Sequence, residues 1–523
     1  MPFRSPYPDV SVPNITLPEL LFRDLEEHRE KPALIDAASG RTLTYGALHL
    51  SSQRFAAALA RRGFAKGDRL AILAPNLPEY AVAVQGTMLA GGIVTTLNPL
   101  YTETEIEHQL HDSGARFLVT VPPLLDKARS PAAHANIERI VCFGQAQDCE
   151  SYDDYIAGQS DPPHVTIDPA QDVAAMLYSS GTTGLPKGVM LTHRNLVAAL
   201  LQSESLFSSG PARSLLILPM FHIFGFHVIT HFDVLHRGTI VTMPRFDMEH
   251  FLQTIERFRI QRVCLVPPIV LGLVKSPLVD NYDLSSLELI FSGAAPLDTG
   301  LAAACEKRLG CAVRQGYGLT ETSPPVCGHP LRGDVVRHGS VGPLCPNTEA
   351  MLMNLSTGEE AAPGEDGELW VRGPQVMKGY YNNPAATRDT IQPGGWLRTG
   401  DIARLDDLGW LSIVDRAKEL IKYKGLQVAP AELEALLLTH PLIADAAVIG
   451  IPDEEAGEVP KAFVVLREEL SPDAIIQFVA ERVAPYKKIR RIEILDQIPK
   501  SPSGKILRRV LKARTGQDSP HHP

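Results

Sequence analysis

Residues 177–196 read LYSSGTTGLPKGVMLTHRNL and form the most informative segment of the chain. Hydroxyl side chains alternate there with glycines, so backbone N–H groups and hydroxyls can surround a polyphosphate while a lysine adds positive charge. The residues concerned are Ser179, Ser180, Gly181, Thr182, Thr183, Gly184 and Lys187. A flexible Gly/Ser/Thr surface loop is the alternative, and composition alone favours it.

The segment is not a Walker A loop, although both are rich in glycine. A Walker A loop places its lysine directly after a glycine and runs straight into a helix. Here Pro186 precedes Lys187, and the apolar residues 189–191 predict a strand. If this loop binds phosphate, it does so in a different way.

On both sides of this segment, short β-branched runs alternate with helical patterns. The alternation covers residues 32–121, with helices predicted over 44–62 and 78–90. It resumes after Asp172 with SLLILPM (214–220), TIVTMP (239–244), RVCLVPP (262–268) and LELIFSG (287–293). This pattern is typical of strand-helix-strand units, so we predict α/β sub-domains with parallel sheets, whose strand ends are where ligands bind.

The pattern of predicted strands and helices changes twice toward the C-terminus. From about residue 341 short, glycine-rich strands predict a small β-rich sub-domain that closes the body over 341–414. Residues 415–523 predict a small α+β domain with a hairpin, a helix opened by Pro430 and a helix over 473–483. We therefore expect an N-terminal domain over 1–414 and a mobile C-terminal domain over 415–523.

Composition excludes several classes of protein. The 523 residues carry a formal net charge of -10 and show no basic stripe, so nucleic acid is not an expected partner. The 7 cysteines are scattered without a C-x-x-C spacing, which indicates neither a disulfide framework nor a zinc site. Without a signal peptide or a transmembrane run, the chain is expected to be cytoplasmic, as a monomer or homodimer.

Further motifs follow residues 177–196 along the chain. They are RQGYGLTET (314–322), GELWVRGPQVMKGY (367–380), WLRTGD (396–401), DRAKELIKYKGLQVAPAELE (415–434) and PKSPSGKILRR (499–509). Together with residues 177–196, they resemble the acyl-adenylate-forming (AMP-binding) superfamily, which includes acyl-CoA synthetases, adenylation domains of peptide synthetases and beetle luciferases. The resemblance runs from about residue 17 to residue 509, and it favours phosphate binding over a plain surface loop.

The resemblance implies a two-step reaction with ATP, Mg2+ and coenzyme A. A carboxylic acid and ATP give acyl-AMP and pyrophosphate, and the acyl group then passes to coenzyme A with release of AMP. Because the substrate's own carboxylate is the nucleophile, the protein mainly positions groups and neutralises charge. The small domain is expected to hinge at Asp415, presenting first Lys505 and then the hairpin that contains Lys422 and Gln427.

The resemblance also assigns roles to individual residues. The catalytic set is Lys505, His222, Lys422 and Gln427. The ATP/AMP set is the seven loop residues above with Ala294, Gln315, Gly316, Tyr317, Thr320, Asp401, Arg416 and Lys418; Glu321 is the magnesium ligand, and Arg245, Lys424 and Gly425 are the coenzyme A contacts. Taken singly, Lys505 could be one more cation of a basic tail and His222 a core histidine.

The resemblance is greatest to 4-coumarate/cinnamate:CoA ligases. The acyl pocket is then expected to be lined by Ile223, Phe224, His227, Ser292, Gly293, Gly318, Pro325 and Val326, with Ala294 and Gly316 beside it. Phe224 stands where plant ligases carry a tyrosine, which leaves cinnamate-like and medium-chain fatty acids open as substrates. A luciferase-like oxygenase, a carrier-protein ligase and a non-catalytic binding protein are the alternatives.

Overall fold

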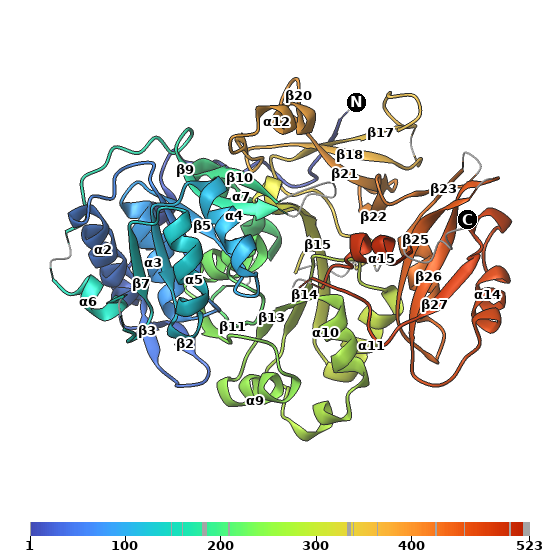
Figure 1. The fold of residues 1–523 in the computed structure, drawn as a ribbon, viewed down its shortest axis with the longest axis horizontal. Coiled ribbons are helices and arrows are strands. Elements are labelled where there is room, and N and C mark those ends of the chain that lie inside the picture. The colour runs from blue at the N-terminus through green and yellow to red at the C-terminus, as the bar shows by residue number, and fades with distance from the viewer. Residues whose placement is uncertain are drawn as a thin grey trace.

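The structure is a computed structural model that describes residues 2–147, 149–158, 161–179, 186–207, 210–331, 336–337, 339–362, 364–423, 426–453, 455–501 and 504–515, without the side chains of 205, 426 and 427. It contains a large α/β body, a β-rich sub-domain and a small C-terminal domain beside the body (Figure 1). The predicted fold class is confirmed. Among the described residues, no helix is both long and apolar enough to cross a bilayer.

The first sheet of the body is mostly parallel. Its order is β19 (Gly379–Tyr380), β10 (Lys187–Thr192), β9 (Val173–Ser179), β5 (Ile93–Thr96), β4 (Arg69–Leu73), β6 (Phe117–Thr120), β7 (Arg139–Cys142) and β8 (Glu150–Ser151). The helices of this part are α1 (Leu17–Phe22), α2 (Tyr45–Arg61), α3 (Pro78–Leu89), α4 (Glu103–Ser113), α5 (Pro122–His134), α6 (Tyr152–Ile156) and α7 (His193–Phe207).

Helices cover both faces of this sheet because its central strand is apolar on both sides. In β4, Leu70 and Ile72 pack in one core with α2 and α3, whereas Ala71 and Leu73 pack in another with α4 and α5. Such doubly covered strands read as continuous apolar runs, as RLAIL does here.

The second sheet has the same design. Its order is β16 (Pro325–Gly328), β15 (Ala312–Gly318), β14 (Leu289–Ser292), β13 (Arg262–Leu265), β11 (Arg213–Leu216), β12 (Thr239–Thr242), β2 (Pro32–Asp36) and β3 (Thr42–Thr44). Its helical segments are η2 (Phe224–His231), α8 (Phe232–Leu235), α9 (Met248–Phe258), α10 (Pro267–Lys275), α11 (Thr299–Leu309) and η4 (Thr320–Thr322). The carboxyl ends of β13, β14 and β15 lie side by side, because these strands pair in parallel.

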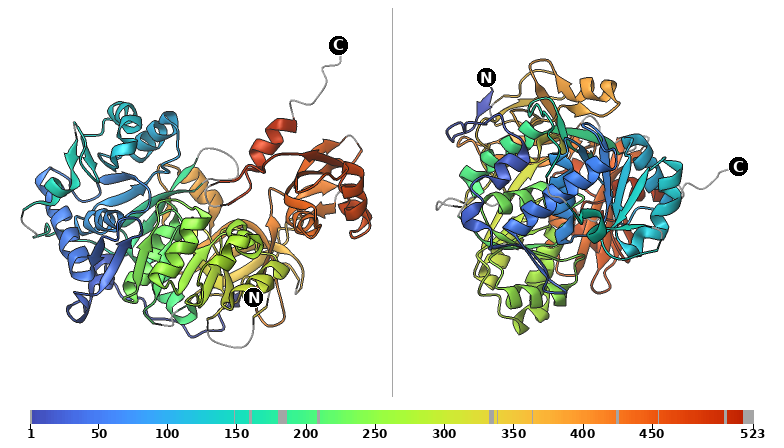
Figure 2. Two further views of the ribbon diagram at one scale, coloured as in Figure 1. Left: turned by 90° about the horizontal axis from the view of Figure 1, so that it is seen from below. Right: turned by 90° about the vertical axis from the view of Figure 1, so that its left-hand side faces the viewer.

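Two mostly antiparallel sheets complete the chain, with β26 and β27 as a parallel pair in the second of them. The third sheet joins β1 (Phe3–Arg4), β17 (Glu349–Met353), β18 (Gly367–Arg372), β21 (Trp396–Leu405), β20 (Ile391–Gln392) and β22 (Leu411–Arg416), with α12 (Pro384–Thr390) alongside. The C-terminal sheet joins β24 (Leu426–Val428), β23 (Ile421–Tyr423), β26 (Gly457–Leu466), β25 (Ile443–Asp453) and β27 (Arg491–Ile494), with α13 (Pro430–Leu438), α14 (Pro472–Ala480) and α15 (Arg508–Thr515). Figure 2 shows this domain to one side of the body.

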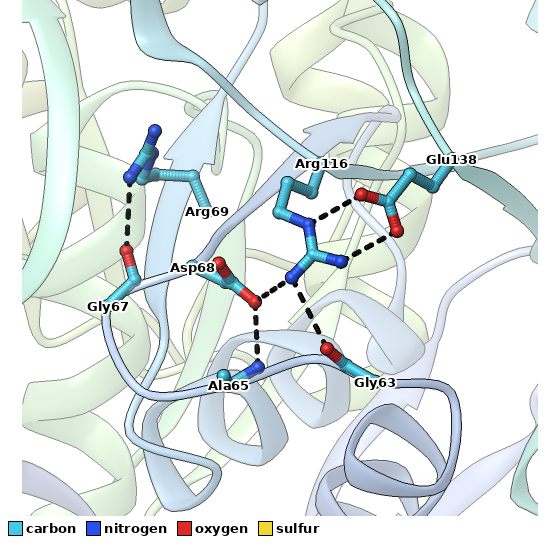
Figure 3. Close-up of polar contacts among 7 residues, drawn as sticks. All are labelled: Gly63, Ala65, Gly67, Asp68, Arg69, Arg116 and Glu138. Atoms are coloured by element: carbon cyan, nitrogen blue, oxygen red, sulfur yellow. Dashed lines mark hydrogen bonds and ion pairs between the residues drawn. The ribbon is translucent and has the colours of Figure 1, made fainter.

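A network of charges closes the amino-terminal edge of the first sheet (Figure 3). The guanidinium of Arg116 donates to both carboxylate oxygens of Glu138 at 2.7 Å and to the carbonyl of Gly63 at 3.3 Å, and it also pairs with Asp68. Asp68 in turn accepts from the backbone N–H of Ala65 at 2.7 Å. The loop between α2 and β4 is thereby fixed at the edge opposite the strand ends where α/β proteins bind ligands.

A chain of buried side chains links η2 to α3 and α7. His227 Nε2 lies 3.0 Å from the carbonyl oxygen of Leu196, so this nitrogen must donate. His227 Nδ1 then accepts from His231 Nδ1 at 2.8 Å, and His231 Nε2 accepts from the Gln85 amide at 2.9 Å. Burial lowers the pKa of His227 to about 3 and that of His231 well below its usual range, so both rings are neutral.

These neutral histidines should make the protein labile to acid. Their folded pKa values lie below the unfolded value of about 6.5, so their stabilisation is present above that pH and is lost as the pH falls through the interval. At pH 5 each of these two histidines should lower the unfolding free energy by about 2 kcal/mol. Between pH 7.5 and pH 5, the unfolding free energy measured with urea should decrease less for His227→Gln than for the wild type. Exposed His134→Gln is the control, and equal decreases for all three proteins would contradict the assignment.

Candidate active site

A buried carboxylate occupies the corner between the body and the third sheet. Asp401 of β21 pairs in register with Arg416 of β22, whose Nε lies 3.3 Å from Asp401 Oδ1. The hydroxyl of Tyr317, at the end of β15, donates to Asp401 Oδ2 at 2.5 Å. Burial raises the pKa of Asp401, while Arg416, Tyr317 and Lys505 counteract that rise. Three residues of the predicted ATP/AMP set therefore meet at one carboxylate, since Tyr317 and Arg416 both contact Asp401.

The two ends of the predicted phosphate loop are also held together. Ser179 and Lys187 are register partners across β9 and β10. The Ser179 hydroxyl donates to Glu321 Oε1 at 2.8 Å, and the Tyr380 hydroxyl donates to the same oxygen at 2.9 Å. Lys187 Nζ lies 4.9 Å from the centre of the Tyr380 ring. The loop residues between these ends, Ser180 to Gly184, lie outside the described residues.

The turn after β15 is compact because it contains glycine at a position of close approach. A Cβ on Gly318 would lie 1.7 Å from the carbonyl oxygen of Pro324, so a side chain there would displace the backbone. Thr320 then opens η4, which carries Glu321. Tyr317 and Glu321 therefore come from one short segment, and the turn directs the phenol of one and the carboxylate of the other to different ends of the site.

The loop after β14 supplies the neighbouring wall. Ser292 and Gln315 are register partners, and the buried side-chain oxygen of Gln315 accepts from the N–H of Leu297 at 3.2 Å. Ala294 has φ +67°, a left-handed conformation that is unusual for a residue with a side chain. The predicted nucleotide residues Ala294, Gln315 and Gly316 thus lie at adjacent strand ends.

Lys505 of the C-terminal domain lies at the same corner. Its N–H donates to the Ser501 hydroxyl at 3.1 Å, and Gly504 turns the chain with φ +77°. A Cβ on Gly504 would lie 3.3 Å from Val266 of the body, which places this loop against the body. Burial and the positive charge of Arg416 lower the pKa of Lys505 to about 8, while Glu419 and Asp401 raise it.

His222 completes the arrangement on the body side. Its Nδ1 accepts from the backbone N–H of Phe224 at 3.3 Å, so Nε2 carries the proton of the neutral ring. Burial and the nearby charge of Lys505 lower the pKa of His222 to about 4. The lysine is therefore close to a neutral imidazole and to the Asp401–Arg416 pair. That combination suits an anionic ligand that reaches from a ribose to a carboxylate.

The comparisons agree with this geometry. A family model described as "AMP-binding enzyme" matches residues 21–381, and one described as "AMP-binding enzyme C-terminal domain" matches residues 432–505. The chain belongs to the AMP-binding enzyme family. "4-coumarate--CoA ligase 1" of Petroselinum crispum is 43% identical over 526 residues, which cover 98% of this chain and 96% of that one.

Solved structures of related proteins superpose on nearly the whole of this AMP-binding enzyme. ATP-bound MatB from Rhodopseudomonas palustris has a TM-score of 0.89 and 30% identity, covering 97% of this chain and 99% of that one. The anthranilate CoA ligase AuaEII, in complex with anthranoyl-AMP, has a TM-score of 0.88 and 27% identity, covering 97% and 98%.

Of the predicted acyl-pocket residues, Phe224 and Gly293 are in close contact. A Cβ on Gly293 would lie 2.8 Å from the ring of Phe224, and buried Ile223, Pro325 and Val326 are neighbours of the site in sequence. His227, in contrast, directs both ring nitrogens to Leu196 and His231 in the interior. The mostly apolar wall around Phe224 suits an alkyl or aryl group.

The residues predicted for coenzyme A and the second step are spread more widely. Lys422 is exposed in β23, and its N–H donates to Glu458 at 2.8 Å. Arg245 is exposed after β12, and Lys418 of the predicted ATP/AMP set is exposed between β22 and β23. Lys424, Gly425 and the side chain of Gln427 lie outside the described residues. In this AMP-binding enzyme, the C-terminal-domain lysine whose charge acts on both His222 and Asp401 is Lys505.

Sequence reasoning missed two residues. Tyr380 ends the quoted motif 367–380, but only the structure shows its hydroxyl on Glu321. Phe291 lies in the quoted strand 287–293, where alternation along β14 puts its ring on the opposite face from Ser292. Phe291 meets Gly316 so closely that a Cβ there would lie 2.6 Å from the ring.

Asp401→Asn should weaken AMP binding. The amide keeps the shape but loses one acceptor oxygen and the charge that pairs with Arg416, so we expect a Kd about tenfold to a hundredfold higher by isothermal titration calorimetry. Asp406→Asn is the matched control, because Asp406 lies in the turn between the same strands and pairs with Arg337. Equal affinities for all three proteins would contradict a nucleotide role for Asp401.

Proposed function

We propose that this AMP-binding enzyme is an ATP-dependent ligase that joins a carboxylic acid to coenzyme A through an acyl-adenylate. The observation that carries the proposal is the position of Lys505, which the C-terminal domain places near enough to His222 and Asp401 for its charge to act on both. The similarity to known proteins also supports the proposal, since homologues are called 4-coumarate--CoA ligases and AuaEII is an anthranilate CoA ligase.

In the first step, a carboxylate oxygen of the substrate attacks the α-phosphorus of ATP and pyrophosphate leaves. Lys505 is proposed to bridge the carboxylate and the α-phosphate, so that its positive charge is placed where negative charge is redistributed in the transition state. Asp401 would accept from the ribose hydroxyls, and Thr320 and Arg416 would hold the α-phosphate. The protein needs no nucleophile of its own for this chemistry.

The carboxylate of Glu321 supplies the kind of hard oxygen ligand that magnesium prefers. Hydrogen bonds from Ser179 and Tyr380 fix its orientation. Mg2+ would neutralise phosphate charge there. Among the described residues, no group of three or more His, Cys, Asp or Glu is placed to hold a metal, so the nucleotide's own oxygens would supply the remaining ligands.

In the second step, the thiolate of coenzyme A attacks the acyl carbonyl and displaces AMP. We propose that the C-terminal domain, residues 415–523, rotates about Asp415 to bring the hairpin with Lys422 and Gln427 into place of Lys505, with Arg245, Lys424 and Gly425 contacting coenzyme A. The Asp415 carboxylate links the end of the third sheet to the first helix of the C-terminal domain, because it accepts from the N–H of Arg416 in β22 at 2.7 Å and from that of Ala431 in α13 at 3.0 Å.

The proposed substrates are aryl acids of the cinnamate type and medium-chain alkyl acids. Phe224 and Gly293 give the pocket an apolar wall, and Phe224 has no hydroxyl with which to recognise a phenol. Discrimination between cinnamate and 4-coumarate should therefore be weak.

The proposal predicts separable half-reactions. With ATP, Mg2+ and a panel of aryl and alkyl acids, the wild type should release pyrophosphate even without coenzyme A. It should form acyl-CoA only when coenzyme A is present. Lys505→Ala should lower adenylation about a hundredfold to a thousandfold, because one charged contact to the transition state is lost. The same variant should still convert supplied acyl-adenylate to acyl-CoA.

Lys512→Ala is the matched control, because Lys512 is an exposed lysine of the following helix. It should match the wild type in both half-reactions. Equal losses of both half-reactions in Lys505→Ala would refute the role of Lys505, and no pyrophosphate with any acid would refute the ligase function.

The lowered pKa of Lys505 predicts a pH profile. The ammonium form is the active one, and with a pKa of about 8 it is lost as the pH rises above that value. kcat/KM for adenylation should therefore fall at alkaline pH, since this parameter reports ionisations of the free enzyme. Lys505→Arg should be slower but should keep its rate to higher pH, because a guanidinium stays charged. An identical alkaline decrease in both proteins would exclude Lys505 as its cause.

A further inference from the structure

The end of the motif 367–380 joins the strands of the proposed phosphate loop to the turn that carries Glu321. β19 adds to the edge of β10, the second strand of that loop. The N–H of Tyr381 donates to the carbonyl of Gly188 at 2.8 Å, and the N–H of Met377 donates to the carbonyl of Glu321 at 2.9 Å. Backbone hydrogen bonds therefore fix this segment both to β10 and to the turn.

The Tyr380 side chain contacts two charged groups of the same site. Its hydroxyl donates to Glu321 Oε1 at 2.9 Å, and its ring centre lies 4.9 Å from Lys187 Nζ. Tyr380 is 8% exposed. Burial and the Glu321 carboxylate raise the pKa of Tyr380, so the phenol keeps its proton and remains a donor. One side chain therefore connects the proposed metal ligand with the lysine of the phosphate loop.

The hydrogen bonds on Glu321 leave one carboxylate oxygen for a ligand. The Ser179 hydroxyl donates at 2.8 Å to Oε1, the oxygen that Tyr380 also contacts. Among the residues that the structure describes, no hydrogen-bond donor reaches Oε2. A carboxylate that is held through one oxygen by two donors can offer the other oxygen to a cation without turning. Glu321 is therefore oriented before a nucleotide arrives.

We propose that Tyr380 is a positioning residue that couples the binding of Mg2+ to the binding of the ATP phosphates. It holds Glu321 by one oxygen and leaves the other for the metal that accompanies ATP, while its ring fixes Lys187 for the phosphates. The proposal rests on the ligase function proposed above, and it gives the motif 367–380 a part in that function.

The coupling is tested by isothermal titration calorimetry of the full-length protein with ATP, once with excess Mg2+ and once with EDTA, without any acid. Mg2+ should tighten ATP binding to the wild type, and the ratio of the Kd in EDTA to the Kd in Mg2+ measures that gain. Tyr380→Phe removes the hydroxyl and keeps the ring. It should lower the ratio about tenfold, as expected for a lost hydrogen bond to a charged group. Its Kd in EDTA should stay at the wild-type value, because Lys187 keeps its aromatic neighbour.

Tyr380→Leu removes the ring as well. It should also raise the Kd for ATP in EDTA about threefold, because the cation–π contact of Lys187 is lost. AMP lacks the two phosphates that Lys187 and Mg2+ are proposed to hold, so both variants should bind AMP as the wild type does. Tyr381→Phe is the matched control, since the neighbouring Tyr381 ring lies 5.8 Å from the guanidinium of Arg69 instead. It should keep the wild-type ratio.

The outcomes distinguish this inference from the ligase proposal. A wild-type ratio in Tyr380→Phe would overturn the inference, and so would an equal loss of affinity for AMP and ATP, which indicates a general structural role. Either result leaves the ligase function standing. If the wild type binds ATP in neither condition, the ligase function is wrong and this inference with it.

Discussion

The buried contact between Asp401 and Arg416 is the constraint on which the site depends. The register of β21 and β22 sets the two residues opposite each other, and Tyr317 from the second sheet adds its hydroxyl to the same carboxylate. Arg416 is also the last residue of β22, and it directly follows Asp415, at which the C-terminal domain is expected to begin. The proposed nucleotide site and the start of the C-terminal domain are therefore one structural element, and we expect a ligand at Asp401 to affect how that domain sits.

Glycines determine how closely aromatic rings and backbone can approach this corner. Gly316 admits the ring of Phe291, Gly293 admits that of Phe224, and Gly318 lets the turn that carries Glu321 close on Pro324. At each of these glycines, the space that a side chain would fill is taken by an aromatic ring or a carbonyl group from another segment. In the proposed function, the acyl pocket takes its shape from the rings that these glycines admit.

Much of this architecture could be predicted from the sequence because strong local patterns and motifs specify it. The helix expected over 44–62 is Tyr45–Arg61, and the strand expected over 189–191 is Lys187–Thr192. The motifs likewise indicated Asp401, Arg416, Tyr317 and Lys505 before the structure placed them together. Resemblance supplied their roles, and the structure supplied their distances.

Other features could not be predicted because they arise from tertiary contacts. Strand β1 pairs Phe3 with Ala350, and nothing in a proline-rich N-terminus indicates that partner. Alternation along β14 separates Phe291 from Ser292, but it does not say which face the helices cover. Periodicity similarly leaves the direction of the His227 ring undefined, since the ring is held by Leu196 and His231.

The charges in the site show how ligand binding and chemistry are coupled. In the free protein, burial disfavours the charged form of Lys505 and of His222. The charge of Arg416 adds to this effect at Lys505, where Glu419 and Asp401 oppose it, and the charge of Lys505 adds to it at His222. An adenylate or ATP brings negative charge to the same corner, which favours the ammonium form of Lys505. At neutral pH a lysine with a pKa of about 8 is already mostly protonated. Nucleotide binding should therefore extend the charged form of Lys505 to higher pH, while His222, with a pKa far lower, stays neutral.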